Sequence, residues 1–244
     1  NCLNQPFNWV NNIKELIAIA TPCEDGFIAL EILFKHHKVN FNFVSSVLVP
    51  KNFTIEFATY APRIIKKFTD LQWSNFRMGL FSKLNDNINI VQKLKFIAAC
   101  RPFTIEGYNT PESTELHNKT HKNLLNLLKS DITDIRANVP AALLQNAKGT
   151  DKIPEIVEKL LIQTLSEKES SARMETLLSF PESTAIYMTS QVSFNCFDTL
   201  VNDENYKVRM AVVTLLGRIV KISPFSVLPL MRRVILDDLF LLNS

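Results

Sequence analysis

Apolar residues in the C-terminal half of the chain recur with the spacing of one face of an α-helix. Between positions 208 and 219 they recur at i, i+4, i+7, i+8 and i+11, and polar or charged side chains occupy many of the positions around them. This stripe predicts a helix, and its members are Val208, Val212, Leu215, Leu216 and Ile219. Ser223 and Pro224 follow as an N-cap and a first-turn proline, so a second helix is expected to begin there.

The same periodicity predicts helices in other parts of the chain, and many of them are punctuated by prolines. The segments with helical spacing are 11–20, 26–37, 60–71, 91–100, 121–130 and 155–165. Segment 38–49 is rich in β-branched residues and would also suit a strand. Because the rest of the chain is helical, we expect a helix or a loop beside a helix in that segment.

Three arginines, Arg136, Arg173 and Arg209, mark an internal repeat with separations of 37 and 36 residues. The position six residues before each arginine is polar in all three copies. Positions twelve and eight residues before and seven residues after it are apolar. This period is close to the ~40 residues of HEAT-type helical hairpins. The predicted fold class is therefore all-α, an α-solenoid of HEAT-like helical hairpin repeats in which stacked neighbours bury one another's apolar faces.

The polar residue six positions before each arginine, which is Ser130, Glu167 or Asp203, is expected in the turn between the two helices of a unit. A carboxylate there can accept backbone N–H groups at the start of the second helix, where the helix dipole favours negative charge. The arginine is then expected to reach the turn of an adjacent unit through charge-assisted hydrogen bonds. We expect Gly217 to allow a neighbouring helix to approach closely.

We divide the chain into three segments. Residues 1–100 are predicted to form divergent helical repeats, residues 101–117 a loop, and residues 118–244 HEAT-like repeats. The last segment holds units around the three arginines and a truncated final helix. The chain lacks an initiator methionine and stops inside a helical pattern, so we expect a fragment of a longer protein.

Composition narrows the class of protein. A hydrophobic fraction of 46% excludes a disordered chain, and only 5 glycines argue against an all-β fold. The net charge of +3 is too small to indicate nucleic-acid binding. The 4 cysteines lack metal or redox spacing and fit a reducing compartment. No apolar run approaches the ~18 residues of a transmembrane segment.

The sequence offers no catalytic, cofactor-binding or metal site. His117 and His121 would share one helix face, but no third ligand is apparent, and we expect solvated histidines near a helix start. The glycines are isolated, so no phosphate-binding loop is expected, and the kinase motifs His-Arg-Asp and Asp-Phe-Gly are absent. Basic positions that could contact an acidic partner are Arg63, Lys67, Arg232 and Arg233, with a solvated surface as the default.

Residues 155–236 carry a series of short motifs in a particular order. An acidic turn precedes an arginine, a Gly-Arg-Ile triplet follows, and prolines and paired arginines come last. The residues that make up these motifs are, in order, Asp203, Glu204, Arg209, Gly217, Arg218, Ile219, Pro224, Pro229, Arg232 and Arg233. In this order they resemble the helical-repeat region of the target-of-rapamycin (TOR) kinases, which belong to the phosphatidylinositol-3-kinase-related kinase family. Residues 1–120 show no motif of that family.

The resemblance implies a non-catalytic scaffold segment of a serine/threonine protein kinase in nutrient and growth signalling. It implies dimerisation of the parent kinase, binding of raptor- or rictor-like companion subunits, and a cytoplasmic location that includes the vacuole or lysosome surface. ATP and Mg would bind in a kinase domain outside this chain. The alternatives are another kinase of the same group, a free-standing HEAT-repeat adaptor such as a transport carrier or phosphatase scaffold, and, last, a helical enzyme.

Overall fold

The computed structural model describes residues 15, 23–51, 53–81, 89–102 and 110–242, and these residues form helices and no strand. The chain divides into two compact units. Unit 1 comprises residues 1–101 and 105–116, and unit 2 comprises residues 102–104 and 117–244. The predicted all-α fold class is confirmed, while the helix expected at 11–20 lies almost entirely outside the described residues.

Unit 1 contains α2 (Glu24–Lys35), α3 (Phe41–Val47), α4 (Ile55–Ile65), α5 (Asp70–Phe81) and α6 (Ile90–Ala99). Helix α4 packs against both α2 and α6. The ring of Phe57 on α4 contacts those of Phe27, Phe53 and Phe96, with centroids 5.3 to 6.0 Å apart. These aromatic contacts join α2, α4 and α6 into one core.

Helix α3 settles the ambiguous segment 38–49 in favour of a helix. The side chain of Asn40 accepts a hydrogen bond from the backbone N–H of Phe43 at 3.0 Å, which is an N-cap. Val44 is fully buried on the inner face of α3. The cap and the tertiary packing therefore override the β propensity of the valines and phenylalanines.

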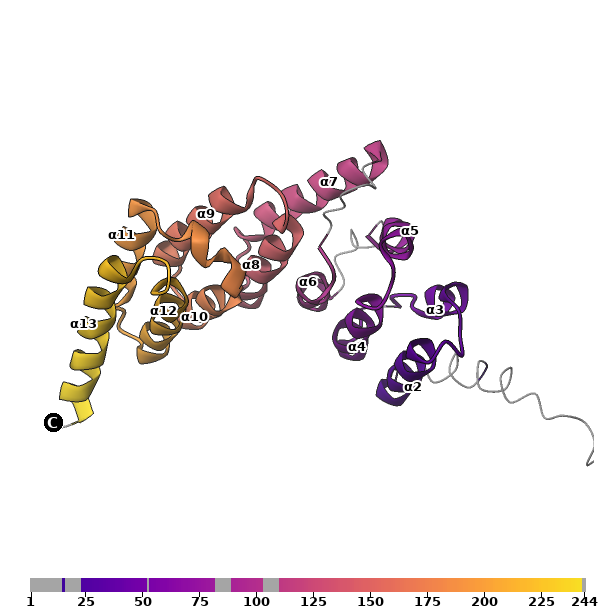
Figure 1. Ribbon diagram of the computed structural model, residues 1–244, viewed down its shortest axis with the longest axis horizontal. Helices are drawn as coiled ribbons and strands as arrows, with labels where there is room; N and C mark the ends of the chain where they lie inside the picture. The colour runs from indigo at the N-terminus through magenta and orange to yellow at the C-terminus, as the bar shows by residue number, and fades with distance from the viewer. Residues whose placement is uncertain (1–14, 16–22, 52, 82–88, 103–109, 243–244) are drawn as a thin grey trace, which may run out of the picture. The chain divides into compact units, whose positions relative to one another are not determined.

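Unit 2 is a succession of helical hairpins (Figure 1). It begins within α7 (Pro111–Leu127) and continues through α8 (Thr133–Ala147), α9 (Ile153–Ser166), α10 (Ser170–Ser179), the 3-10 helix η2 (Glu182–Tyr187), α11 (Gln191–Leu200), α12 (Tyr206–Ile219) and α13 (Pro224–Leu242). Helix α10 packs against α8 and α12 in one layer, and α11 packs against α9 and α13 in the other. This layered stacking is the arrangement predicted for an α-solenoid.

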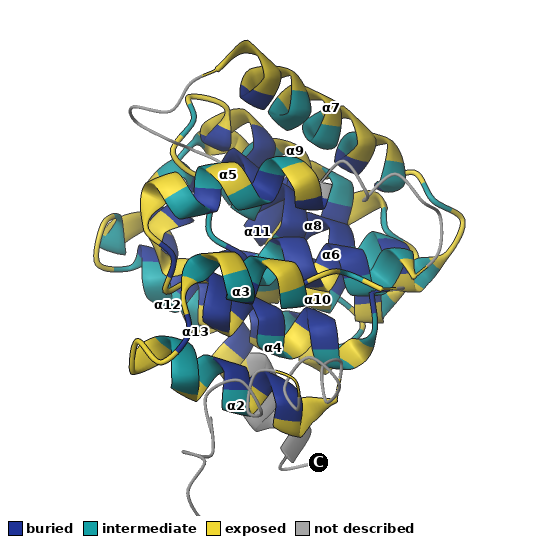
Figure 2. Ribbon diagram, turned by 90° about the vertical axis from the view of Figure 1, so that its right-hand side faces the viewer, coloured by how far each residue is buried: buried dark blue, intermediate teal, exposed yellow. Residues whose placement is uncertain are grey.

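Buried and exposed residues alternate along the helices that face the viewer in Figure 2, such as α3 and α4. The apolar repeat positions are mostly buried: Leu124, Leu161 and Phe197 are each at most 2% exposed. Leu165 departs from the pattern, because it is 39% exposed. Its neighbour Thr164 takes the buried side of α9 and satisfies its hydroxyl by donating to the carbonyl of Leu160 at 2.7 Å.

The predicted loop at 101–117 is wrong for its last part, because α7 already begins at Pro111. Thr110 caps this helix by accepting a hydrogen bond from the backbone N–H of Ser113 at 3.2 Å. Proline at the first helical position has no N–H to leave unpaired, so it favours a helix start rather than a loop. His117 and His121 consequently lie inside the helix and are half-buried, not solvated near its start. Residues 103–109 of the predicted loop lie outside the described residues.

Candidate functional site

The three repeat turns of unit 2 share one backbone geometry. In each, a side-chain oxygen accepts a hydrogen bond from the backbone N–H two residues later. Ser130 Oγ accepts from Ile132 at 3.2 Å, and Glu167 Oε1 accepts from Glu169 at 3.2 Å. Asp203 Oδ1 completes the set by accepting from the backbone N–H of Asn205 at 2.9 Å. These bonds satisfy N–H groups that a helix start leaves without partners.

Each repeat arginine also holds its own turn. Nη1 of Arg136 donates to the carbonyl oxygen of Ser130 at 2.7 Å. Nη1 of Arg173 donates to the carbonyl of Glu167 at 3.0 Å, and Nη1 of Arg209 donates to that of Asp203 at 2.9 Å. The acceptor is six residues before the arginine in every case, so the repeat visible in the sequence corresponds to one recurring hydrogen bond.

The remaining guanidinium nitrogens of two arginines reach the next turn along the chain. Nε and Nη2 of Arg136 donate to Glu167 Oε2 and Oε1 at 2.7 and 2.9 Å. Nε and Nη2 of Arg173 donate in the same way to Asp203 Oδ2 and Oδ1 at 2.8 and 2.9 Å. We call these two bidentate pairs the arginine–carboxylate ladder. Each links successive hairpins with the paired geometry that arginine and carboxylate favour.

The ladder is shielded from solvent to different degrees. The side chains of Arg173 and Asp203 are 9% and 8% exposed, whereas those of Arg136 and Glu167 are 17% and 10% exposed. The hydrogen bond from Arg136 lowers the pKa of Glu167, although burial acts in the opposite direction. The hydrogen bond that Arg173 donates to Asp203 raises the pKa of Arg173, again against the effect of burial. In each pair the charged arginine and the charged carboxylate stabilise each other, as expected of a structural ion pair.

Other side chains join elements about one repeat apart. In unit 2, Ser190 Oγ donates to Glu158 Oε1 at 2.6 Å, and Gln163 Nε2 donates to the carbonyl of Leu128 at 3.1 Å. In unit 1, Arg101 Nη1 donates to the carbonyl of Phe68 at 2.6 Å. These contacts span 32, 35 and 33 residues. Unit 1 therefore contains contacts at the repeat spacing, although its sequence shows no repeat motif.

Two of the predicted partner contacts in unit 1 are engaged within the unit. Arg63 Nε and Lys67 Nζ of the α4 region lie 3.2 and 2.6 Å from the two carboxylate oxygens of Glu31 on α2. The Arg63 side chain nevertheless remains 54% exposed. The structure thus gives both cations a role in joining α2 to α4, and their role toward a partner stays a prediction.

The basic pair on α13 is split between two environments. Arg233 Nη1 lies 3.0 Å from Asp198 Oδ1 on α11, and both side chains are largely exposed. Arg232 is exposed and forms no ion pair with the residues that the structure describes. Its contact with a partner likewise stays a prediction.

Gly217 does not have the role that the sequence analysis gave it. A Cβ placed on this residue would meet no atom within 4 Å, apart from its own helix and chain neighbours. The prediction of a close helix approach is therefore wrong, because Gly217 lies on a half-buried side of α12 that faces open space.

The histidine pair does not assemble a metal site. The rings of His117 and His121 are parallel to within 13°, with centroids 6.3 Å apart. No group of three or more His, Cys, Asp or Glu side chains suited to a metal occurs in the described part of the chain. Burial lowers the pKa of His121, and the nearby Lys152 acts in the same direction. Cys23 and Cys196 are free thiols, Cys100 is buried, and Cys2 lies outside the described residues. The helices, as far as they are described, include none long and apolar enough to cross a membrane.

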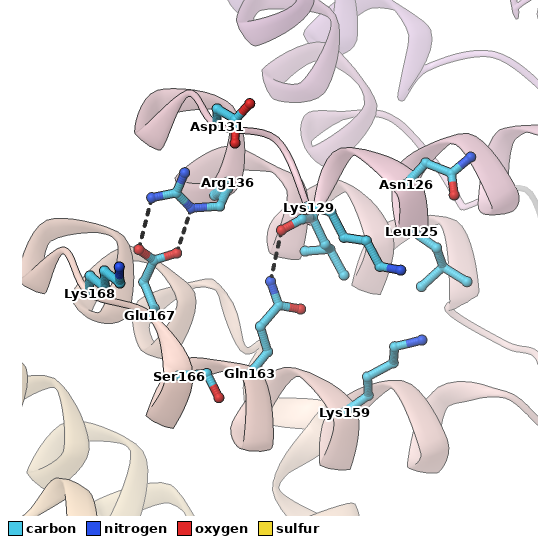
Figure 3. A pocket seen from close by; sticks show the side chains of 11 residues that line it. Leu125, Asn126, Lys129, Asp131, Arg136, Lys159, Gln163, Ser166, Glu167 and Lys168 are labelled. Atoms are coloured by element: carbon cyan, nitrogen blue, oxygen red, sulfur yellow. Dashed lines mark hydrogen bonds and ion pairs between the residues drawn. The ribbon is translucent and has the colours of Figure 1, made fainter.

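A groove of about 720 Å³ lies beside the first pair of the ladder. Figure 3 shows side chains from the end of α7, the following turn and α9 around it. Its lining residues are Leu125, Asn126, Leu128, Lys129, Asp131, Arg136, Lys159, Gln163, Ser166, Glu167 and Lys168. We call it the α7–α9 groove. Sequence reasoning missed it, because its lysines come from elements that only the hairpin stacking brings together.

Tandem helical hairpins whose turns recur with the same geometry along the chain define an α-solenoid of the HEAT-like class. A family model described as HEAT repeat matches residues 194–223, which include most of α11 and α12 with the Asp203 turn and Arg209. The chain is also 24% identical over 208 residues to the serine/threonine-protein kinase tor1 of Schizosaccharomyces pombe. That alignment covers 80% of this chain and 8% of the relative. The chain thus carries a HEAT-repeat match within its stacked helices and is distantly similar to part of a TOR kinase.

Proposed function

We propose that the chain is a non-catalytic scaffold segment of a TOR-like serine/threonine protein kinase. The observation that carries the proposal is the similarity to tor1, which extends over 80% of a chain built from stacked helical hairpins. Stacked hairpins present extended surfaces, which repeat proteins commonly use to bind other proteins. In this proposal the segment supports dimerisation of the parent kinase and binding of raptor- or rictor-like companion subunits in nutrient and growth signalling.

The chemistry of the ladder supports a scaffold role. Its arginines and carboxylates are hydrogen-bonded to each other and to the turn backbone, so no group of the ladder is held ready to exchange a proton with a substrate. ATP and Mg belong, in this proposal, to a kinase domain elsewhere in the parent protein. The location would be the cytoplasm, including the surface of the vacuole or lysosome.

The experiment is an affinity purification of the tagged parent protein, with and without the ladder variant Arg173→Ala. We expect the variant to recover less companion subunit and less of a second, differently tagged copy. The kinase activity per molecule on a short peptide substrate should be retained, because the altered pair lies outside the catalytic domain. Lys207→Ala, which removes an exposed charge of α12 outside the ladder, is the matched control and should behave like the unaltered protein.

Two results would contradict the proposal. A reading frame that encodes no kinase domain would favour a free-standing HEAT-repeat adaptor. Full recovery of companion subunits and of the second copy by a parent protein from which the whole segment has been removed would exclude a scaffold role for the segment.

A further inference from the structure

The α7–α9 groove is lined by lysines that have no counter-ion among the residues that the structure describes. Its lysines are Lys129 in the turn after α7, Lys159 on α9 and Lys168 in the turn after α9. All three side chains are exposed, and none forms an ion pair or hydrogen bond through its ammonium group with a described residue. The groove therefore offers three ammonium groups to a ligand.

The carboxylates of the groove do not neutralise these lysines. Glu167 is held by the two-pronged hydrogen bond from Arg136, so this pair contributes no net charge. Asp131 is the one further carboxylate among the lining residues. Figure 3 shows Asp131 at the Arg136 end, while Lys129 and Lys159 extend from opposite walls toward the same space. Like charges that face one another across a groove favour an anionic group between them.

Two contacts join the walls of the groove. The Arg136–Glu167 pair lies toward one end, and Gln163 donates from α9 to the carbonyl of Leu128 at 3.1 Å. Leu128 is 4% exposed, whereas Leu125 is half-buried and leaves apolar surface within the groove. Asn126 adds a side-chain amide that can bond a peptide group. A volume of about 720 Å³ falls within the ~300–1,000 Å³ usual for ligand pockets.

We infer that the α7–α9 groove binds a linear acidic segment of a partner protein, in which Asp or Glu side chains meet Lys129, Lys159 and Lys168 and an apolar side chain contacts Leu125. Lysines act as mobile point charges, so they suit carboxylates at varied spacing more than one fixed bidentate anion. The amide and apolar contacts favour a peptide over a lipid headgroup, because a concave groove admits a chain more readily than a flat bilayer. The inference rests on the proposed scaffold function, since it names the chemistry of one partner.

The test measures binding of a fluorescein-labelled peptide of repeating Glu-Asp-Leu units to the whole 244-residue chain. Fluorescence anisotropy gives the affinity, and the same peptide with Gln-Asn-Leu units is the uncharged control. The groove variant replaces Lys129, Lys159 and Lys168 by Ala. The matched control makes the same change in charge at three exposed lysines elsewhere in unit 2, namely Lys148, Lys207 and Lys221.

We expect the unaltered chain to bind the acidic peptide and not the amide peptide, with affinity that falls as salt is raised. The groove variant should bind about tenfold more weakly, the sum of several modest ion pairs, while the control variant binds as the unaltered chain does. Circular dichroism should show the same helical signal for all three proteins.

Three results would overturn the inference. They are no binding of the acidic peptide, an equal loss in both variants, and stronger groove-dependent binding to phosphatidylinositol-phosphate vesicles than to the peptide. A phosphoserine version of the peptide that alone binds would assign the groove to phosphorylated partners instead. None of these results bears on the recovery of companion subunits by the parent protein, so failure here is distinct from failure of the proposed function.

Discussion

Removal of the Arg173 side chain is the sharpest perturbation of the ladder. This guanidinium donates to both carboxylate oxygens of Asp203 and to the carbonyls of Glu167 and Lys168. Arg173→Ala therefore leaves a nearly buried carboxylate and two turn carbonyls without their donor. The change acts on the link between two successive hairpins, so it tests whether the stack depends on this contact.

The size of the effect follows from burial. Removing one partner of a buried ion pair costs about 3–5 kcal/mol, because the other charge stays buried without compensation. The Arg173 and Asp203 side chains keep 9% and 8% of their exposure, which allows some solvation of the remaining carboxylate. We therefore expect Arg173→Ala to lower the unfolding free energy by about 3 kcal/mol, at the low end of that range.

The assay is urea unfolding at pH 7, followed by circular dichroism, with hydrogen exchange to locate the loss in α10 and α12. Arg233→Ala is the control, because its partner Asp198 is 35 residues away, compared with 30 for Arg173 and Asp203, but the two side chains are 43% and 59% exposed. An exposed pair of this kind contributes about 0–1 kcal/mol. A cycle with Asp203→Ala then isolates the coupling between Arg173 and Asp203.

Equal destabilisation by Arg173→Ala and Arg233→Ala would refute the reasoning, because burial would then have no bearing on the strength of the link. So would a loss confined to unit 1, or a coupling energy near zero in the cycle.

Three further predictions concern single positions in unit 2. Gly217→Ala should raise the unfolding free energy by about 0.5–1 kcal/mol in thermal melts, because the added methyl group meets open space and alanine favours the helix; a lower melting temperature would contradict this. Asn146→Leu should also stabilise, by about 1 kcal/mol, because the Asn146 amide is 0% exposed and bonds to no described residue; a loss in urea unfolding would show that the amide is satisfied. Burial lowers the pKa of His121 from 6.5, so this residue binds its proton more readily in the unfolded chain, and the unfolding free energy should fall as the pH drops below about 6.5. His121→Asn should reduce this dependence of the unfolding free energy on pH. An unchanged dependence in the variant would exclude His121 as its source.

The repeat and its turns could be read from the sequence because the same residue types return at nearly constant spacing. Arg136, Arg173 and Arg209 set the register, and the polar residues six positions earlier, a serine and two carboxylates, indicated the turns. The spacing also predicted that an arginine would contact a neighbouring turn. It did not reveal that one guanidinium holds its own turn and the next turn at once, because that depends on the distance between stacked hairpins.

Other features depend on which way a helix faces. Gly217 looked like a packing glycine because a sequence does not say whether a helical position faces a neighbour or open space. The start of α7 was missed because polar residues follow Pro111 and mask the helical pattern. The α7–α9 groove is made by Lys129 and Lys159, which are far apart in the sequence and meet only through stacking.

The central claim is that the hairpins are tandem units, each stabilised by its neighbours. Deleting residues 168–203 removes one 36-residue period and leaves Arg209 six residues after Glu167, so the shortened chain keeps the turn register. Circular dichroism melts should show a helical protein that still unfolds cooperatively, whereas deletion of residues 168–185, half a period, should abolish the transition of unit 2. Loss of that transition in both deletions alike would contradict the account.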